Sequence, residues 1–399
     1  MDIRTPRGFR SSTAHVGLKE TDKDFSVLVS ETPATCSAVF TRSRFAGPSV
    51  VLSREAVRDG SARGVVVVAR NANVATGKQG EENAREVRRA VAAGIGVDEE
   101  ELLIASTGVI GRQYPMPLLR AHLSTLDWPF PEADFADVAG AMMTTDTRPK
   151  AVSVACGDAV ITGVAKGVGM IEPDMATLLA FFCTDARIDR AELDRVFRAV
   201  MDRTFNALSI DTDTSTSDTA AIFANGLAGP VDPEEFAAAL ETAAVHLVRE
   251  IARDGEGASK LIEVRVTGAR DDAQAKRVGK TVVNSPLVKT AVHGADPNWG
   301  RVAMAVGKCQ DDLDIVPERV RIAFGEVEVY PTGQADGTDG ADGGGGADGT
   351  DQALERLREH LRGDEVTIRV DLGIGAGAFT VYGCDLTEGY IRLNADYTT

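Results

Sequence analysis

The sequence has few cysteines, few histidines and no long apolar run. Its five cysteines are scattered without a CxxC pair, so they indicate neither a disulfide framework nor a zinc ribbon, and we expect a reducing, cytoplasmic location. The five histidines are too dispersed to suggest a metal site. No stretch approaches the ~20 apolar residues that span a bilayer, and residues 1–18 lack a signal-peptide core. We therefore expect neither a membrane anchor nor a bound metal.

Basic residues are outnumbered by acidic ones. The chain has 43 Lys and Arg against 60 Asp and Glu, and its formal net charge of −17 repels polyanions, so nucleic acid is not an expected partner. The phosphate-loop, GxSxG and HExxH motifs are also missing, which leaves the common nucleotide, serine-hydrolase and zinc-peptidase chemistries without support. With 43% hydrophobic residues among 399, the composition is that of a folded protein of one or two domains.

Strand-like runs rich in β-branched residues alternate with segments of helical spacing, which predicts a mixed α/β protein. The predicted strands cover residues 25–29, 64–69, 102–105, 152–164, 261–267, 320–330 and 365–371, and the predicted helices cover residues 81–93, 191–200, 234–252 and 352–361. Residues 333–351 are almost entirely Gly, Asp, Ala and Thr, so we expect a flexible insertion there. Strand-like sequence is expected to resume after it and continue to the last residue.

The segment KGVGMIEPDMAT (166–177) runs from a glycine-rich turn to the pair Ala176 and Thr177, and apolar residues 178–183 follow. A small residue followed by Thr, at a junction from loop to strand, suits an enzyme that cuts its own chain. The released α-amino group has an unperturbed pKa of roughly 7.7 to 8.0 and can act as general base for the Thr177 hydroxyl. A Thr that merely begins a strand would have the same local pattern, so these residues alone do not distinguish a self-cleaving nucleophile from an ordinary strand residue.

Seven further polar motifs follow one another along nearly the whole chain. They are STGVIG (106–111), MTTDTRPK (143–150), DTDTSTSDT (211–219), DGEGA (254–258), SPLVKT (285–290), DPNWGR (296–301) and NADYTT (394–399). Together with the 166–177 segment, and in this order, they resemble the ornithine acetyltransferases, the glutamate N-acetyltransferase family of the cyclic arginine pathway.

This resemblance implies a self-cleaved enzyme. Cleavage between Ala176 and Thr177 would leave an α chain of residues 1–176 and a β chain of residues 177–399, assembled as an α₂β₂ heterotetramer. Thr177 would carry the acetyl group from N²-acetyl-L-ornithine to L-glutamate as an ester, in a ping-pong cycle without a cofactor. The implied fold is an αββα sandwich similar to those of self-cleaving aminopeptidases and N-terminal nucleophile hydrolases.

The resemblance also assigns roles to individual residues. Thr107 and Gly108 would form the oxyanion hole, Lys166 would pair with the substrate α-carboxylate, and Glu256 would bind a substrate cation. The substrate-binding positions are Thr144, Lys166, Thr177, Glu256, Asn394 and Thr399. Thr145 or Thr147 could replace Thr144 in this alignment. Asp146, Asn206 and Ser209 are candidates for orienting the cleavage loop.

One segment departs from the family pattern. Ala69 and Arg70 precede the Asn-Ala-Asn run at 71–73, where the family has Ser-Gly. With RFAGPSV (44–50) and residues 172–174, this makes the chain similar to the paralogues of clavulanic-acid-type antibiotic gene clusters, which implies acetyl recycling without acetyl-CoA. Three alternatives stay open: a self-cleaving amidohydrolase or aminopeptidase, an acetyltransferase for a related metabolite of a specialised pathway, and a processed protein that only binds amino acids.

Overall fold

The chain folds into two units, which we describe separately. A computed structural model describes residues 3–172, 178–331 and 347–396. The first unit contains the chain up to residue 206 together with residues 213–251. The second unit contains residues 207–212 and the chain from residue 252 onward.

Two β-sheets form the centre of the first unit. One sheet has the order β1 (Phe9–Ala14), β2 (Phe25–Ser30), β4 (Gly64–Val68) and β5 (Leu102–Ser106). The other has the order β3 (Thr35–Phe40), β9 (Thr219–Pro230), β8 (Leu179–Arg187), β7 (Ala159–Lys166) and β6 (Lys150–Cys156). Neighbouring strands are antiparallel except for the parallel pairs β4 with β5 and β8 with β9.

The inner faces of these sheets share one core. Val65 and Leu103 from the first sheet and Phe181 and Phe223 from the second are fully buried in the same apolar cluster. The helices α1 (Pro48–Ala56) and α4 (Phe135–Met142) add side chains to this cluster. The two sheets therefore pack face to face, as in a β-sandwich.

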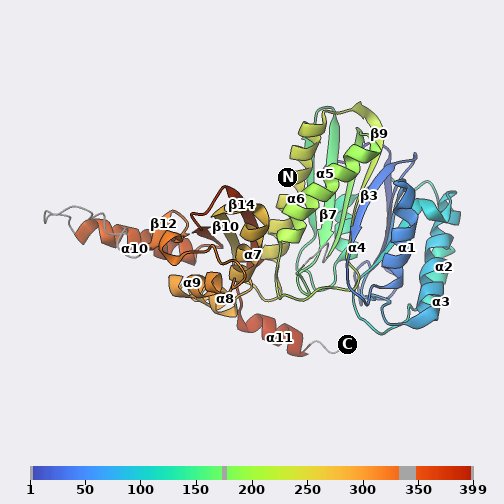
Figure 1. Cartoon of the computed structure of the whole chain (residues 1–399). Coiled ribbons are helices and arrows are strands. Elements are labelled where there is room, and N and C mark those ends of the chain that lie inside the picture. Colours follow the sequence, from blue (N-terminus) through green and yellow to red (C-terminus); the bar gives the residue numbers. More distant parts are fainter. Residues whose placement is uncertain (1–2, 173–177, 332–346, 397–399) are drawn as a thin grey trace. The chain divides into compact units, whose positions relative to one another are not determined.

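Helices cover both outer faces of this sandwich. On the first sheet, Val66 packs in one cluster with Val87 of α2 (Gly77–Ile95) and with Leu119 of α3 (Met116–Leu123). On the second sheet, Phe182 stacks edge to face on Phe197 of α5 (Arg190–Arg203), and α6 (Pro233–Arg253) approaches β7. Figure 1 shows the resulting order of helix, sheet, sheet and helix. The predicted αββα sandwich is thereby confirmed for this unit.

Local sequence explains these layers. In α2, Val87, Val91 and Ile95 recur every four residues and are buried, because they form the stripe that faces the sheet. The strand β4 reads GVVVV without polar alternation, and every residue in it is buried. Such a run is expected where helices cover one face of a strand and a second sheet covers the other.

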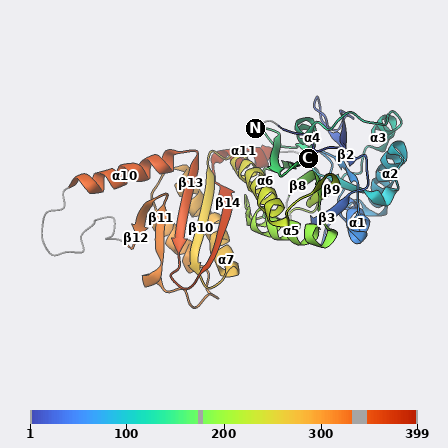
Figure 2. The same ribbon diagram turned by 90° about the horizontal axis from the view of Figure 1, so that it is seen from above.

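The second unit is built on a single sheet. Its order is β12 (Val327–Tyr330), β11 (Arg321–Phe324), β13 (Glu365–Asp371), β10 (Leu261–Ala269) and β14 (Gly377–Cys384), as Figure 2 shows. The helices of this unit are α7 (Asp272–Val283), α8 (Pro286–His293), α9 (Trp299–Gly307), α10 (Ala347–Arg362) and α11 (Glu388–Asp396). Buried side chains of α7 to α10 share one core with the sheet. In contrast, α11 has no buried residue.

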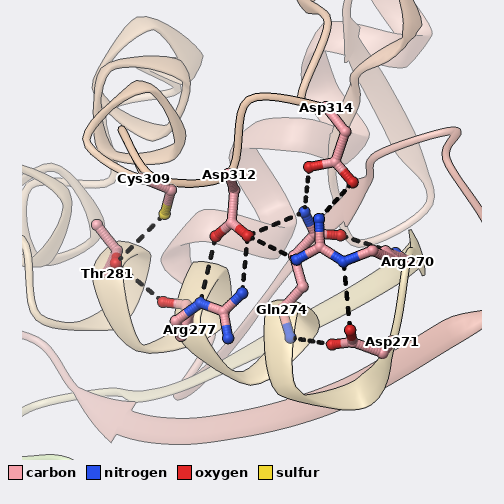
Figure 3. A network of polar contacts seen from close by, with 8 residues as sticks. All are labelled: Arg270, Asp271, Gln274, Arg277, Thr281, Cys309, Asp312 and Asp314. Carbon is pink, nitrogen blue, oxygen red and sulfur yellow. Dashed lines mark hydrogen bonds and ion pairs between the residues drawn. The ribbon is translucent and has the colours of Figure 1, made fainter.

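A polar network ties the loop after α9 to the first turns of α7 (Figure 3). Asp312 is buried and accepts hydrogen bonds from Arg270 at 3.0 Å and from Arg277 at 2.7 Å. Asp314 pairs with Arg270 at 2.6 Å, and Gln274 donates to both carboxylates. Hydrogen bonding from Arg277 outweighs burial and holds the pKa of Asp312 below its ordinary value. These contacts hold the loop in place without a disulfide.

The four predicted helices are present, but four other sequence predictions need correction. Residues 152–164 and 320–330 each fold as parts of two strands, since two-residue turns interrupt the β-branched runs after Cys156 and after Phe324. The described part of the chain does not end in a strand, because α11 occupies residues 388–396. The helix α10 begins at Ala347, inside the segment 333–351 predicted as an insertion; residues 333–346 lie outside the described part of the chain.

Candidate active site

The turn after β5 contains Thr107 and Gly108. The Thr107 amide donates to the Val68 carbonyl at 3.1 Å, and the Val109 amide donates to the Arg70 carbonyl at 3.2 Å. Gly108 has a φ of +128°, and a Cβ placed on it would lie 2.2 Å from the carbonyl carbon of Arg70. Only glycine fits this position, because it lacks the Cβ and tolerates the positive φ.

Lys166 lies at the end of β7 and is buried. Its Nζ donates a hydrogen bond to Thr107 Oγ1 at 3.3 Å. These two residues are 59 positions apart; Thr107 directly follows β5 and Lys166 ends β7, two strands of different sheets. The structure therefore brings together the predicted oxyanion turn and the predicted substrate lysine.

Asp146 is the centre of the polar contacts around this turn. Its Oδ1 accepts from Lys150 Nζ at 2.8 Å and from the Gly167 amide at 2.7 Å, while its Oδ2 accepts from the Thr144 amide at 3.1 Å. The side chains of Asp146 and Lys150 are both fully buried. Burial opposes ionisation, yet the charges of Lys166 and Lys150 outweigh it and lower the pKa of Asp146 to about 2. Asp146 is therefore an anion that connects the Thr144 loop to the start of the 166–177 segment.

Thr144 takes part in this arrangement through its backbone. Its amide donates to Asp146, and its carbonyl accepts from Arg70 Nη1 at 3.3 Å. The structure thus places the Thr144 loop beside Arg70. It does not show which of Thr144, Thr145 and Thr147 is the substrate contact. From the sequence, Asp146 was predicted only as a candidate for orienting the cleavage loop and Lys150 was not singled out, although the two are four residues apart in one motif.

The predicted cleavage pair, Ala176 and Thr177, lies outside the described residues, but its flanks are described. Upstream, the Glu172 amide donates to the Asp213 carbonyl at 2.8 Å, and Thr214 Oγ1 donates to the Glu172 carbonyl at 3.2 Å. Downstream, the Thr219 amide donates to the Leu178 carbonyl at 3.0 Å. The motif at 211–219 therefore holds the chain on both sides of the predicted scissile bond.

In the second unit, Glu256 and Asn394 meet. Asn394 Nδ2 donates to Glu256 Oε2 at 2.9 Å and to the Tyr390 carbonyl at 3.0 Å. Glu256 lies in the turn after α6, and the next residue, Gly257, packs its backbone against Tyr390, where a Cβ would lie 2.3 Å from the Tyr390 amide nitrogen. The last predicted substrate residue, Thr399, lies outside the described part of the chain.

Asp385 anchors this turn. This buried carboxylate accepts from the amides of Ser259 and Lys260 at 2.8 and 2.9 Å and also from the Ser259 hydroxyl. The Nδ1 atom of His293 lies 3.0 Å from Asp385 Oδ2. The chain between β14 and α11 is therefore joined to the turn that carries Glu256.

Residues 10–399 match the profile of the ArgJ family. The chain belongs to the ArgJ family. A glutamate N-acetyltransferase named Oat2, from Streptomyces clavuligerus, is 71% identical over 99% of this chain and 98% of its own length. An arginine biosynthesis bifunctional protein ArgJ from Rhodococcoides fascians is 54% identical over 100% of this chain and 96% of its own. The predicted family is thereby confirmed, and so is the prediction that the chain is an acyltransferase of this family.

Solved structures of ArgJ proteins are also similar. One from Bacillus halodurans is 40% identical and covers 55% of this chain and 100% of its own, with a TM-score of 0.47. An ornithine acetyltransferase from Mycobacterium tuberculosis, solved in complex with ornithine, is 30% identical and covers 43% of this chain and 94% of its own, with a TM-score of 0.39.

No described helix combines the length and apolar character that a membrane crossing requires. Among the same residues, no three His, Cys, Asp or Glu side chains are grouped as metal ligands.

Asp146 makes the stability of this ArgJ-family protein depend on pH. Its folded-state pKa of about 2 lies below the ordinary value of 3.8, so the unfolded chain binds more protons in acid. The resulting stabilisation, about 2 kcal/mol at 1.36 kcal/mol per pKa unit, is present above about pH 4 and is lost as the pH falls towards 2. Urea unfolding from pH 7 to pH 3 should show the stability gap between wild type and Asp146→Asn narrowing in acid.

The exposed substitution Asp127→Asn is the control for this titration, since it removes the same charge from the surface. Its stability should follow that of the wild type at every pH. A gap between wild type and Asp146→Asn that stays constant down to pH 3 would refute the role assigned to the buried carboxylate.

Proposed function

We propose that the chain is a self-processing glutamate N-acetyltransferase of arginine biosynthesis. Cleavage between Ala176 and Thr177 frees the amine of Thr177, which takes the hydroxyl proton as Thr177 Oγ1 attacks the acetyl carbonyl of N²-acetyl-L-ornithine. The amide bond breaks and L-ornithine leaves with a proton. The amine of L-glutamate then attacks the acetyl ester, which gives N-acetyl-L-glutamate and restores the hydroxyl.

The contact between Lys166 and Thr107 carries this proposal. It places a cation and a hydroxyl beside a glycine turn, at the end of the strand from which the 166–177 segment continues. In the proposed mechanism, Thr107 and Gly108 stabilise the oxyanion of the tetrahedral intermediate, a role worth about 10²- to 10³-fold in rate per donor. Lys166 binds the α-carboxylate of the substrate. The relatives named as glutamate N-acetyltransferase and ArgJ support the same reaction.

The remaining roles follow from the same proposal. Glu256 and Asn394 bind the amino-acid substrate, as do Thr144 and Thr399. The ornithine bound to the Mycobacterium tuberculosis relative supports a basic amino acid as one substrate. Because one amide is exchanged for another through an ester, the transfer needs no cofactor. Two cleaved precursors assemble as an α₂β₂ heterotetramer, and the free cysteines favour a reducing cytoplasm.

Acetyl-labelled N²-acetyl-L-ornithine tests this function. With L-glutamate present, the label should appear in N-acetyl-L-glutamate in equal amount to the ornithine released. Without glutamate, turnover should stop after one acetyl group per active site, and hydroxylamine should release that group from the protein. Continuous release of labelled acetate at the same rate with and without glutamate would instead identify a hydrolase. Binding of acetylornithine without any acetyl-enzyme would identify a protein that only binds amino acids.

A further inference from the structure

Arg70 forms one wall of the Thr107–Gly108 turn. Its backbone has a φ of +67°, an uncommon conformation for a residue with a side chain. Its carbonyl accepts from the Val109 amide, and its carbonyl carbon occupies the space where a Cβ on Gly108 would lie. Backbone strain of this kind is concentrated at functional sites, where the surrounding structure maintains it. Arg70 therefore belongs to the immediate surroundings of the oxyanion turn.

The Arg70 side chain is held by one contact that leaves most of its donors available. It is half-buried, and its Nη1 donates to the Thr144 carbonyl at 3.3 Å. Within the described part of the chain, no carboxylate pairs with it. A guanidinium has five N–H donors in a planar fork that matches the two oxygens of a carboxylate. Arg70 is thus positioned by the Thr144 loop and keeps donors for a ligand.

The surrounding contacts are rich in positive charge. Hydrogen bonds link Arg70 to Thr144, Thr144 to Asp146, and Asp146 to Lys150, while the charge of Lys166 also acts on Asp146. Among these described side chains, three are cations and one is an anion, in a chain whose net charge is −17. Such a local excess favours a ligand with more than one negative group.

We propose that Arg70 binds the side-chain carboxylate of the acetyl acceptor while Lys166 binds its α-carboxylate. Arg70 is then the residue that makes the acetyl-enzyme prefer a dicarboxylic amino acid over its uncharged analogue. This inference rests on the proposed function, because it concerns the second half of that reaction. The product, N-acetyl-L-glutamate, has lost the ammonium charge and is a dianion, so it also matches two cations.

Acceptor selectivity tests this assignment. We would measure kcat/KM for L-glutamate and for L-glutamine, with N²-acetyl-L-ornithine as donor, in wild type and in Arg70→Gln. Loss of a charge-assisted pair should lower kcat/KM for glutamate by about 10- to 100-fold and that for glutamine by less than about 3-fold. The exposed substitution Arg195→Gln removes the same charge from the surface and should leave the ratio of the two values unchanged.

The outcomes separate the possible roles of Arg70. If kcat/KM falls by the same factor for both acceptors, Arg70 only supports the Thr144 loop and the proposal is wrong. If Arg70→Gln does not fold, Arg70→Lys is the test, because an ammonium keeps the charge but loses the planar array of N–H donors. Arg70→Lys should reduce the preference for glutamate over glutamine by about 3- to 10-fold. An unchanged preference overturns the proposal. A wild type that transfers acetyl to no acceptor would refute the proposed function itself.

Discussion

A Thr177→Ala variant is expected to remain a single chain of 42.2 kDa and to transfer no acetyl group. The wild type should separate under denaturing conditions into fragments of residues 1–176 and 177–399. The reason is chemical: in the proposed mechanism the same hydroxyl attacks the Ala176 carbonyl during maturation and the acetyl carbonyl during turnover, and alanine has no nucleophile. Intact mass and N-terminal sequencing of the freshly purified proteins measure the first effect, and the labelled transfer assay measures the second.

Two further variants serve as controls for the Thr177→Ala experiment. Thr177→Ser keeps a hydroxyl and should still be cut, more slowly if the threonine methyl group orients the hydroxyl. Thr214→Ala removes a hydroxyl that bonds to the neighbouring Glu172 carbonyl and should still be cut. Cleavage of Thr177→Ala at the same bond would show that another protease cuts the chain. An uncut wild type that transfers acetyl would show that the free amine of Thr177 is not needed.

Gly108→Ala is expected to lower kcat by about 10²- to 10³-fold, the loss typical of one oxyanion-hole donor. The added Cβ would lie 2.2 Å from the Arg70 carbonyl carbon, so the Thr107–Gly108 turn must move away from the wall formed by Arg70. A shift of this size separates the turn from the position where the oxyanion develops. The measurement is kcat for acetyl transfer, with circular dichroism to establish that the variant is folded.

Gly111→Ala is the matched control for this substitution. Gly111 also has a positive φ, +84°, but a Cβ on it would meet no described heavy atom within 4 Å. Both variants thus place an alanine at a positive φ, but only Gly108→Ala adds a steric clash with Arg70. If both retain kcat within about threefold of the wild type, the Thr107–Gly108 turn does not serve as the oxyanion hole.

The sequence predicted helices well where a wide apolar stripe is present, as in α2 and α6. It did not separate β6 from β7, because Gly157 and Asp158 interrupt the apolar pattern for only two residues. It did not mark out β14 within the strand-like sequence expected up to the last residue, because the glycines of β14 lower its strand propensity, although β10 pairs with it along most of its length. Pairing between distant strands overrides local propensity there, and a single sequence does not contain that information.

For the candidate site, the motif order predicted an oxyanion turn and a substrate lysine and correctly identified the family. It did not show that Asp146 and Lys150 form a fully buried ion pair, because burial depends on how the Thr144 loop packs. It also did not show that Asp385 anchors the Glu256 turn, since these residues are separated by more than 100 positions. The motifs predict the reacting groups, while the residues that hold these groups in place become visible only in the fold.

The pairing of β7 with β8 bears on how the enzyme is made. Lys166 and Leu179 are opposite each other in these antiparallel strands, so the predicted cut falls in the connection between two hydrogen-bonded neighbours. The β-sheet would then continue across the break and keep both fragments as one particle after maturation. Refolding after denaturation would differ from the first folding, because two separate chains would have to associate again. Proteolytic maturation would therefore make folding effectively a one-time event, and the lifetime of the cleaved enzyme would depend on its rate of unfolding.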